Sequence, residues 1–410
     1  MQSTINSRLT AFLRNQKSKR ILWCYIIAGI FAPFIAGNKP LLFINKGGIH
    51  FPAFSSSAYV ELQPEEKPVL ANSVDWRSMN ATLCILPPVC YSPNELDPHN
   101  ANFASPFGTQ WQQLTNGELA PLTWRHRHWL GTTRTGQDVL SILIHGCRTS
   151  LLIGFGAVGL AALIALLFGL FAGYYGNEKL HYRRTNLLLG IIIFTLSIFY
   201  SIQLSNAFQL SSTSQWLLFA FIISFLILLA RKMLSIFSRS STSKVKLAAF
   251  PADKLLTAIT AGFISLPRLL ILLSLAALWE TSITGLLLII GLTSWAEAAR
   301  VIRTEMLRMR SLPFMQHAQQ SGASDIKIIL HHALPNLSAT IRVLFLTGIA
   351  TAILSEAGLT FLGIGLPFDT PSWGALLFEA KRNLQAWWLV LFPGLVIFTL
   401  TRVLFTLSKK

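Results

Sequence analysis

Charge of either sign is scarce in this sequence. Only 12% of its 410 residues are charged, 52% are hydrophobic, and the mean hydropathy is +0.52. A soluble domain carries about 25% charged residues, so this composition excludes an ordinary soluble protein and indicates an integral membrane protein. Acidic residues are the scarcest, since 17 Asp and Glu oppose 34 Lys and Arg. The basic residues stand beside apolar segments, so anionic lipid headgroups and the positive-inside rule explain the net charge of +17 more simply than nucleic acid does.

Cysteine is also rare, and the motifs of common enzyme classes are absent. Four cysteines are too few for a dense disulfide framework. Cys84 and Cys90 flank the segment ILPPV, and the sequence leaves their pairing open. There is no G-x-x-x-x-G-K-[ST] motif, hence no P-loop ATPase site. No Ser-His-Asp set, metal-ligand spacing or paired catalytic carboxylates stand out, so we expect no catalytic residue, no metal site and no cofactor bound by this chain.

Long hydrophobic runs are what the sequence contains instead. A membrane-spanning helix needs about 20 apolar residues. By this criterion the sequence predicts eight spans, which are Ile21–Gly37, Ser150–Ala172, Asn186–Ser205, Gln215–Ala230, Leu256–Leu278, Ile283–Ala299, Thr340–Leu362 and Trp388–Leu404. Lys and Arg concentrate in alternate connectors, whereas the connector Asn206–Ser214 has no charge. The positive-inside rule therefore places both termini and the segment Pro313–Asn336 in the cytoplasm.

Segments outside the spans have their own character. Residues 1–20 are basic and amphipathic, which predicts an interfacial helix ahead of the first span, itself expected to be an uncleaved signal-anchor. Residues 38–127 are rich in proline, which predicts a compact, irregular extracytoplasmic subdomain. Asp138 is predicted to cap the helix that follows it, after a turn that uses Gly131 and Gly136.

The segment Pro313–Asn336, PFMQHAQQSGASDIKIILHHALPN, is a polar island between two apolar segments. Phe314–Ser321 is predicted to form a short helix that ends at Gly322, because glycine can take the left-handed conformation that ends a helix. Ser324 is predicted to cap a second helix with an acid in its first turn. Pro335 is predicted to close that helix near the next membrane entry.

This spacing resembles the cytoplasmic loop of ABC importer permeases, which runs Glu-Ala-Ala, three residues, Gly, and about a dozen residues to an Ile-x-Leu-Pro end. Gly322 and Leu334-Pro335 stand at the matching places, whereas Gln316-His317-Ala318 replaces Glu-Ala-Ala. The resemblance implies that the loop fits into a groove on a separate ATPase subunit. The residues that it assigns to this coupling loop are Gln316, His317, Ala318, Gly322, Ala323, Asp325, Leu334 and Pro335.

Other segments resemble dipeptide, oligopeptide and nickel permeases in the same order. HWLGTTRTGQD, at 128–138, resembles H-x-L-G-T-D-x-x-G-R-D, with Thr133 and Gln137 in place of Asp and Arg. LSEAGLTFLGIGLPFDTPSWGALL, at 354–377, resembles the family segment E-A-x-L-S-F-L-G-x-G…P-x-x-P-S-W-G. NKPLL, at 38–42, is similar to the subgroup that includes microcin C-type peptide permeases.

The resemblance implies an all-α integral membrane protein with the transmembrane fold of type I ABC importers. It covers about 128–177 and 251–400, which leaves an insertion between the two matching parts. About eight membrane helices are implied, six in a core and two in the insertion, with a long extracytoplasmic loop. The implied organisation is an N-terminal segment with the first membrane helix (1–37), an extracytoplasmic subdomain with the entry segment (38–147), and the permease domain (148–410), which includes the insertion (178–250) and the coupling loop (313–336).

The implied function is that of a permease subunit of an ATP-driven importer for peptides or similar small solutes, in the bacterial cytoplasmic membrane. The implied partners are a sister permease, P-loop ATPase subunits that hold ATP and Mg, and an extracytoplasmic substrate-binding protein. The sequence leaves open whether the cargo is a peptide, a metal chelate or a peptide antibiotic. The alternative function is a proton-coupled secondary peptide transporter that uses Glu356 and Arg268 as a relay.

Arg268 and Glu356 are the candidate pathway residues. Arg268 follows Pro267 well inside a predicted span, where a charge is costly and normally faces a bundle interior or a water-filled cavity. Pro267 is predicted to kink this helix. Arg268 either meets a carboxylate of the substrate or is a structural partner for backbone carbonyls or for Glu356. Glu356 matches a family position and is expected to pack between helices.

Overall fold

The computed structural model describes most of the chain, namely residues 2–45, 48–54, 59–60, 69–70, 76, 83–113, 118–177, 181–182, 248–249, 251–278 and 282–409. The chain divides into two compact units. The first combines Met1–Leu170 with Ile259–Lys410, and the second is Phe171–Ala258.

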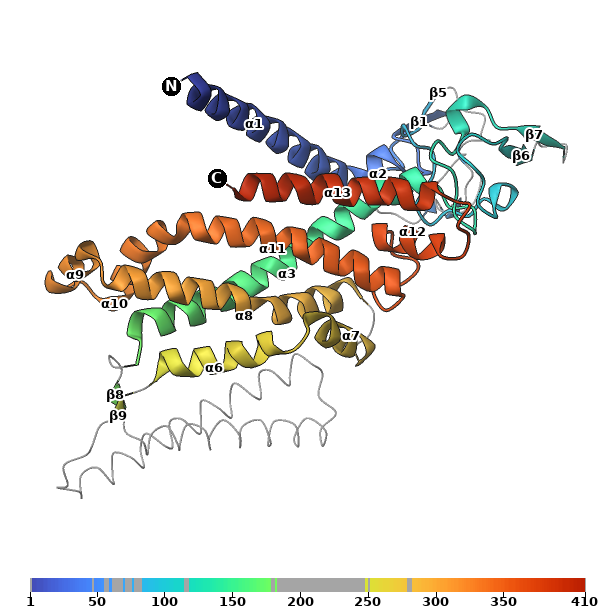
Figure 1. Cartoon of the computed structure of the whole chain (residues 1–410). Coiled ribbons are helices and arrows are strands. Elements are labelled where there is room, and N and C mark those ends of the chain that lie inside the picture. Colours follow the sequence, from blue (N-terminus) through green and yellow to red (C-terminus); the bar gives the residue numbers. More distant parts are fainter. Residues whose placement is uncertain are drawn as a thin grey trace. The chain divides into compact units, whose positions relative to one another are not determined.

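Long helices dominate the described chain (Figure 1). Those long and apolar enough to cross a membrane are α3 (Val139–Tyr175), α8 (Ile283–Arg310), α11 (Leu334–Leu362) together with its leading turns, and α13 (Trp388–Ser408). The helices α6 (Ala252–Ser265) and α7 (Arg268–Leu278) pass the same test as a pair bent by 82°. The described residues thus carry four spanning helices, or five if the bent pair is one span.

The sequence located several helix ends correctly. The starts predicted at Ile283 and Trp388 and the end predicted at Leu362 are confirmed. The predicted continuous span Leu256–Leu278 is instead broken before Arg268, because proline at the preceding position has no N–H to donate and clashes with the preceding turn. The expected kink is therefore confirmed. The two predicted spans at 186–205 and 215–230 lie outside the described residues.

The N-terminal boundary was predicted wrongly. Helix α1 (Gln2–Ile30) runs through the basic segment without a break and ends well short of Gly37. Residues 2–28 contain neither Gly nor Pro, so nothing interrupts the helix where the charge pattern changes. A bend at Phe31 separates it from the short α2 (Ala32–Ile35), which contains a proline in its first turn. Helix α1 is not among the described helices that are long and apolar enough to cross a membrane. It packs against α13, where the Tyr25 hydroxyl donates to the carbonyl of Val396 at 3.2 Å.

Short strands and 3-10 turns form the described part of residues 38–127, as the proline content predicts. A three-stranded antiparallel sheet has the order β2-β1-β5, with Phe43 opposite both His50 and Cys84. Phe43 packs edge-on against Trp76, with 5.1 Å between the ring centroids. None of the four cysteines, all of which lie within the described residues, forms a disulfide bond. The elements are β1 (Leu42–Asn45), β2 (Gly48–His50), β3 (Tyr59–Val60), β4 (Val69–Leu70), β5 (Leu83–Ile85), η1 (Pro98–Asn100), β6 (Trp111–Gln113), β7 (Leu119–Pro121) and η2 (Trp124–His126).

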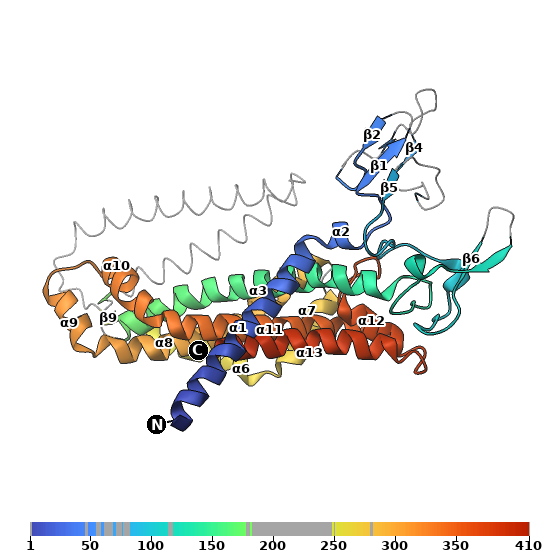
Figure 2. The same ribbon diagram turned by 90° about the horizontal axis from the view of Figure 1, so that it is seen from above.

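The opposite ends of the first unit carry different structures. A polar loop between α8 and α11 contains α9 (Pro313–Gln320), α10 (Asp325–Ile328) and the π-helical turn η3 (Ile329–Ala333). Both views show this loop at one end of the helices of the first unit, with α12 (Trp373–Ala380) and the strands of residues 42–121 at the other (Figures 1 and 2). The loop and the strand-bearing region therefore belong to opposite ends of the membrane part.

Helix α12 is fixed to α3 by one tryptophan. Trp373 is fully buried, and its indole nitrogen donates to the carbonyl of Leu143 at 3.0 Å. A Cβ on Gly146 would lie 2.7 Å from the Trp373 ring, so only glycine allows this close approach. The start of α12 is capped by Ser372, whose hydroxyl accepts from the amide of Ala375 at 3.1 Å.

In the second unit, a strand pair joins the ends of the segment that interrupts the family resemblance. Strands β8 (His181–Tyr182) and β9 (Ala248–Ala249) pair antiparallel, with His181 opposite Ala249. The Asn177 carboxamide accepts from the amide of Lys254 at 3.1 Å. The chain therefore enters and leaves residues 183–247 at one place.

Candidate functional site

The predicted glycine turn of the coupling loop is present in the structure. Gly322 has φ +78°, the left-handed conformation that ends α9. Behind it, the amide of Ser321 donates to the carbonyl of His317 at 2.9 Å, and that of Ala323 to Ala318 at 3.3 Å. This is the hydrogen-bond pattern of a helix end that turns sharply. A Cβ on Gly322 would meet nothing within 4 Å, so the backbone conformation alone calls for glycine.

Two details of the loop differ from the prediction. Ser324 stands at the start of α10, with Asp325 in the first turn as predicted, but its side chain makes no capping bond. Pro335 does not end the helix, because it lies in the first turn of α11, where no N–H is required. The π-helical turn leads directly into α11, and the side-chain Nδ2 of Asn336 donates to the carbonyl of His332 at 2.7 Å. The run from Asp325 to Leu362 is therefore continuous over 38 residues.

One face of the coupling loop is buried and the other is exposed. The side chains that anchor it are Met315, Ala318, Ile328 and Ala333, all buried. We define the loop face as the exposed residues Phe314, Gln316, His317, Ile326 and Leu330. Of these, Ile326 is 69% and Leu330 is 50% exposed, so the loop face combines apolar and polar side chains. Of the other predicted loop residues, Asp325 and Pro335 are exposed, and Ala323 and Leu334 are half-buried.

Arg268 begins α7 directly after the bend. Its Nη2 donates to the hydroxyl of Ser294 on α8 at 2.7 Å. Its Nε is buried and has no acceptor among the described residues. Glu297, one turn further along α8, is close enough to interact with it electrostatically. The guanidinium is thus held on one side and unsatisfied on another, which is the condition of a group that is free to bind an anion.

Glu356 lies elsewhere, between α11 and α3. It is fully buried, and its carboxylate accepts from the Ser150 hydroxyl at 3.0 Å and from the Thr360 hydroxyl at 3.4 Å. Both residues belong to the described chain, yet no ion pair joins Arg268 to Glu356. The two candidate pathway residues are therefore not brought together, and the contacts of Glu356 favour helix packing.

The sequence analysis missed a buried charge cluster at the N-terminal end of α3. The imidazole of His128 is fully buried between two carboxylates, with Nδ1 3.0 Å from Oδ1 of Asp138 and Nε2 3.2 Å from Oδ2 of Asp97. Its ring stacks on Tyr91 at 4.0 Å between centroids. Asp138 also caps α3, as predicted, by accepting from the amide of Ser141 at 2.7 Å. The family-like motif that begins at His128 could have pointed to His128 and Asp138. Nothing in the sequence around Asp97, 31 residues earlier, indicated that it is the second partner.

The cluster shifts the pKa values of His128 and Asp97. Burial by itself lowers the pKa of His128, but the hydrogen bonds and charges of Asp138 and Asp97 outweigh it and leave the pKa above its ordinary value. Burial raises the pKa of Asp97, but hydrogen bonds from His128, Asn100 and the His99 amide outweigh it and leave the pKa below its ordinary value. His128 lies between two carboxylates that favour its protonated form, and it therefore links the loop before η1 to the start of α3.

Comparison with known proteins shows which family and which proteins the chain resembles. A model described as the binding-protein-dependent transport system inner membrane component matches residues 246–409, which include the coupling loop. The dipeptide transport system permease protein DppC of Alkalihalophilus pseudofirmus is 27% identical over 271 residues, 66% of this chain and 65% of that protein. The inner membrane ABC transporter permease protein YejE of Escherichia coli is 24% identical over 408 residues, 98% of this chain and 92% of that protein. The peptidoglycan transport system permease protein YejE of Agrobacterium fabrum is 28% identical over 410 residues, 94% of this chain and 86% of that protein.

Proposed function

We propose that the chain, which resembles the peptide family of ABC importer permeases, forms the membrane pathway of an ATP-driven importer for peptides or similar small solutes. The observation that carries this proposal is the coupling loop, with its left-handed Gly322, inside the region that matches the family model. The relatives are transport permeases, so the expectation of a non-enzymatic transport subunit is confirmed. One relative is named for dipeptides and another for peptidoglycan, which supports peptide-like cargo.

The loop face is the proposed contact with the ATPase. It combines exposed apolar side chains, Ile326 and Leu330, with the polar Gln316 and His317. A rigid, mixed surface of this kind suits a groove on another protein. We propose that the ATPase subunits hold ATP and Mg, that their closure moves this loop, and that the continuous helix from Asp325 to Leu362 carries the movement into the membrane. A separate extracytoplasmic binding protein would deliver the solute.

A sister permease is the proposed neighbour of the bent pair α6–α7. Large apolar side chains are exposed on it, among them Leu266 at 58% and Leu270 at 58%. Arg268 stands between these two leucines in the chain and is half-buried against Ser294 of α8, and a charge within the membrane normally faces protein or water rather than lipid. A second permease subunit would cover the apolar residues and leave the guanidinium beside a shared pathway.

The protein is a multi-pass membrane protein, and its orientation and full helix count are proposed from the sequence. Both termini and the coupling loop are assigned to the cytoplasm by the distribution of Lys and Arg. Eight spans are proposed, with the permease domain at 148–410 and an insertion of two spans at 178–250. The pairing of β8 with β9 supports an even number of added spans, because the inserted segment begins and ends at one place.

The alternative drawn from the sequence was a proton-coupled transporter with Glu356 and Arg268 as a relay. The relatives do not support it, and each residue has separate partners, Ser150 for Glu356 and Ser294 for Arg268. The energy source distinguishes the two functions, since the proposed importer needs ATP and the alternative needs a proton gradient.

If Arg268 holds a carboxylate of the solute, Arg268→Lys should weaken uptake of free-acid peptides by about tenfold and affect C-terminally amidated peptides much less. A guanidinium makes two parallel hydrogen bonds to a carboxylate, which an ammonium does not reproduce. Uptake of an acid and amide peptide pair at matched protein abundance measures the effect, with Arg300→Lys on exposed α8 surface as the control. An unchanged acid-to-amide ratio would leave Arg268 with a packing role.

A further inference from the structure

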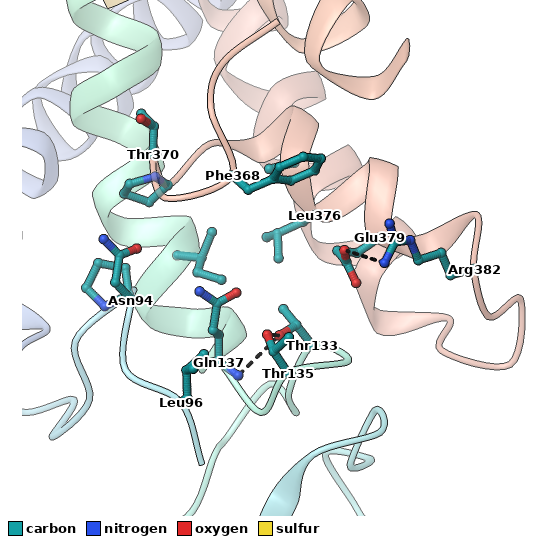
Figure 3. A pocket seen from close by; sticks show the side chains of 14 residues that line it. Asn94, Leu96, Thr133, Thr135, Gln137, Phe368, Thr370, Leu376, Glu379 and Arg382 are labelled. Atoms are coloured by element: carbon teal, nitrogen blue, oxygen red, sulfur yellow. Dashed lines mark hydrogen bonds and ion pairs between the residues drawn. The ribbon is translucent and has the colours of Figure 1, made fainter. Parts of the chain in front are cut away.

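A cavity of about 320 Å³ opens among three segments of the first unit, at the end that carries α12 (Figure 3). It is lined by the segment around Asn94 and Leu96, by the turn that precedes α3, and by α12 with the residues leading into it. Sites for small molecules generally enclose about 300–1,000 Å³ and combine apolar walls with a few placed polar groups. This cavity has the size and the lining of such a site, and neither Arg268 nor the coupling loop contributes to it.

The polar groups stand on two facing walls. On one, the hydroxyls of Thr133 and Thr135 lie 3.2 Å apart beside the carboxamide of Gln137. On the other, Glu379 of α12 lies beside Arg382, with 3.9 Å between Oε1 and Nη1 (Figure 3). That ion pair is weak, because its geometry is long and the Arg382 side chain is 44% exposed.

The second carboxylate oxygen of Glu379 lacks a hydrogen-bond donor. Oε2 is buried and accepts no hydrogen bond from any described residue. Leaving a buried carboxylate oxygen without a donor is unfavourable, and such atoms in native proteins call for an explanation. The Glu379 side chain lines the cavity and is 20% exposed, although Oε2 itself is closed off from solvent. Rotation of the carboxylate would bring this oxygen to a ligand that carries a positive charge and several donors. A primary ammonium has three donors, and the hydroxyls and carboxamide opposite offer further acceptors.

The walls of the cavity are held in place before any ligand arrives. Asp97 and Asp138, which follow Leu96 and Gln137 of the lining, are joined through the buried His128. Between them, a Cβ on Gly136 would lie 2.0 Å from the carbonyl oxygen of Asp97, so the two segments are in direct contact. The helix α12 is fixed separately by its buried tryptophan. Binding therefore costs little ordering of the site.

We propose that this cavity binds the terminal ammonium of the imported peptide, with Glu379 as the anionic partner. This proposal rests on the proposed transport function. It adds a recognition site at the end of the helices opposite the coupling loop. A lysine side chain of a docked binding protein would present the same ammonium. A concave cavity of this volume suits a small free peptide better than a single protruding side chain.

The test measures binding to the full-length chain in lipid nanodiscs, by isothermal titration and saturation-transfer NMR. The probes are trialanine, N-acetyl-trialanine, and Nα-acetyl-lysine amide. Trialanine should bind about tenfold or more tightly than its acetylated form, because a hydrogen bond to a charged group is lost on acetylation. Glu379→Gln should abolish that preference. Arg382→Gln, which removes the ion pair but keeps the carboxylate, should preserve it.

Asp369→Asn is the matched control. It removes one exposed carboxylate between two lining residues, Phe368 and Thr370, and should bind both peptides as the wild type does. Equal binding of free and acetylated trialanine by the wild type, or an intact preference in Glu379→Gln, overturns the proposal. Tighter binding of Nα-acetyl-lysine amide than of trialanine also overturns it, in favour of a lysine side chain. The assay needs no ATP and no partner, so its failure leaves ATP-driven uptake to be judged separately.

Discussion

Replacing Gly322 with valine should lower uptake per ATP hydrolysed by about tenfold or more, while the protein still inserts and accumulates. The left-handed conformation costs an L-residue about 1–2 kcal/mol, and a branched side chain resists it most. A bias of this size disfavours the native turn by about tenfold. No neighbour lies within 4 Å of the added Cβ position, so the effect comes from the backbone and not from a clash. The two helices α9 and α10 would then lie at the wrong angle to each other, and the residues of the loop face would no longer form one surface.

Gly322→Asn separates this reason from a simple need for a small residue. Asparagine tolerates the left-handed conformation far better than valine does. It should therefore retain most of the coupling, although it adds a larger polar side chain. Both variants are compared as reconstituted complexes with the ATPase, at equal protein content, by measuring uptake and hydrolysis together. Normal uptake per ATP in the valine variant would show that this turn does not transmit the motion.

Replacing His128 with leucine should destabilise the N-terminal end of α3 by about 3–5 kcal/mol, the usual effect of removing one partner from a buried ion pair. The change leaves the carboxylates of Asp97 and Asp138 without the imidazole that both of them contact. Amide exchange of the segment around Asp138, followed by mass spectrometry, should accelerate by at least about 100-fold. His99→Leu removes an exposed histidine two residues from Asp97 and should leave exchange unchanged. Unchanged protection in His128→Leu would show that the contacts of His128 with Asp97 and Asp138 do not stabilise this end of α3.

The stabilisation that His128 and Asp97 provide should decrease both at high pH and at low pH. The raised pKa of His128 means that its stabilisation is complete below its unfolded pKa, about 6.5, and is lost as pH rises through its higher folded pKa. The lowered pKa of Asp97 means that its contribution is present above about 3.9 and is lost as pH falls through its lower folded pKa. Protection in the wild type, corrected for intrinsic exchange, should be greatest between these two values.

Periodicity, length and turn chemistry made part of this structure predictable. The apolar runs located α8, α11 and α13 because a spanning helix must satisfy its backbone internally over a fixed length. Gly322 was predictable because few residues accept its conformation, and the capping role of Asp138 because its side chain accepts from an amide three residues on. These signals are local, so no knowledge of distant contacts was needed.

Other features depend on contacts that sequence spacing does not reveal. The partner of His128 at Asp97 comes from a proline-rich segment with no periodic pattern. Pro335 was expected to end a helix, but a π-helical turn accommodates it, and such turns carry no sequence signal. Glu379 was not singled out, because its significance lies in an oxygen left without a donor in a folded cavity.

The most direct test of the transport function is the energy source of uptake. The chain is reconstituted into proteoliposomes with a sister permease, ATPase subunits and a binding protein, and entry of a labelled tripeptide is measured. Uptake should require hydrolysable ATP, fail with a non-hydrolysable analogue, and persist when a protonophore collapses any proton gradient. Uptake by the chain alone, driven by an imposed proton gradient in the absence of ATP, would contradict the assignment and restore the secondary transporter.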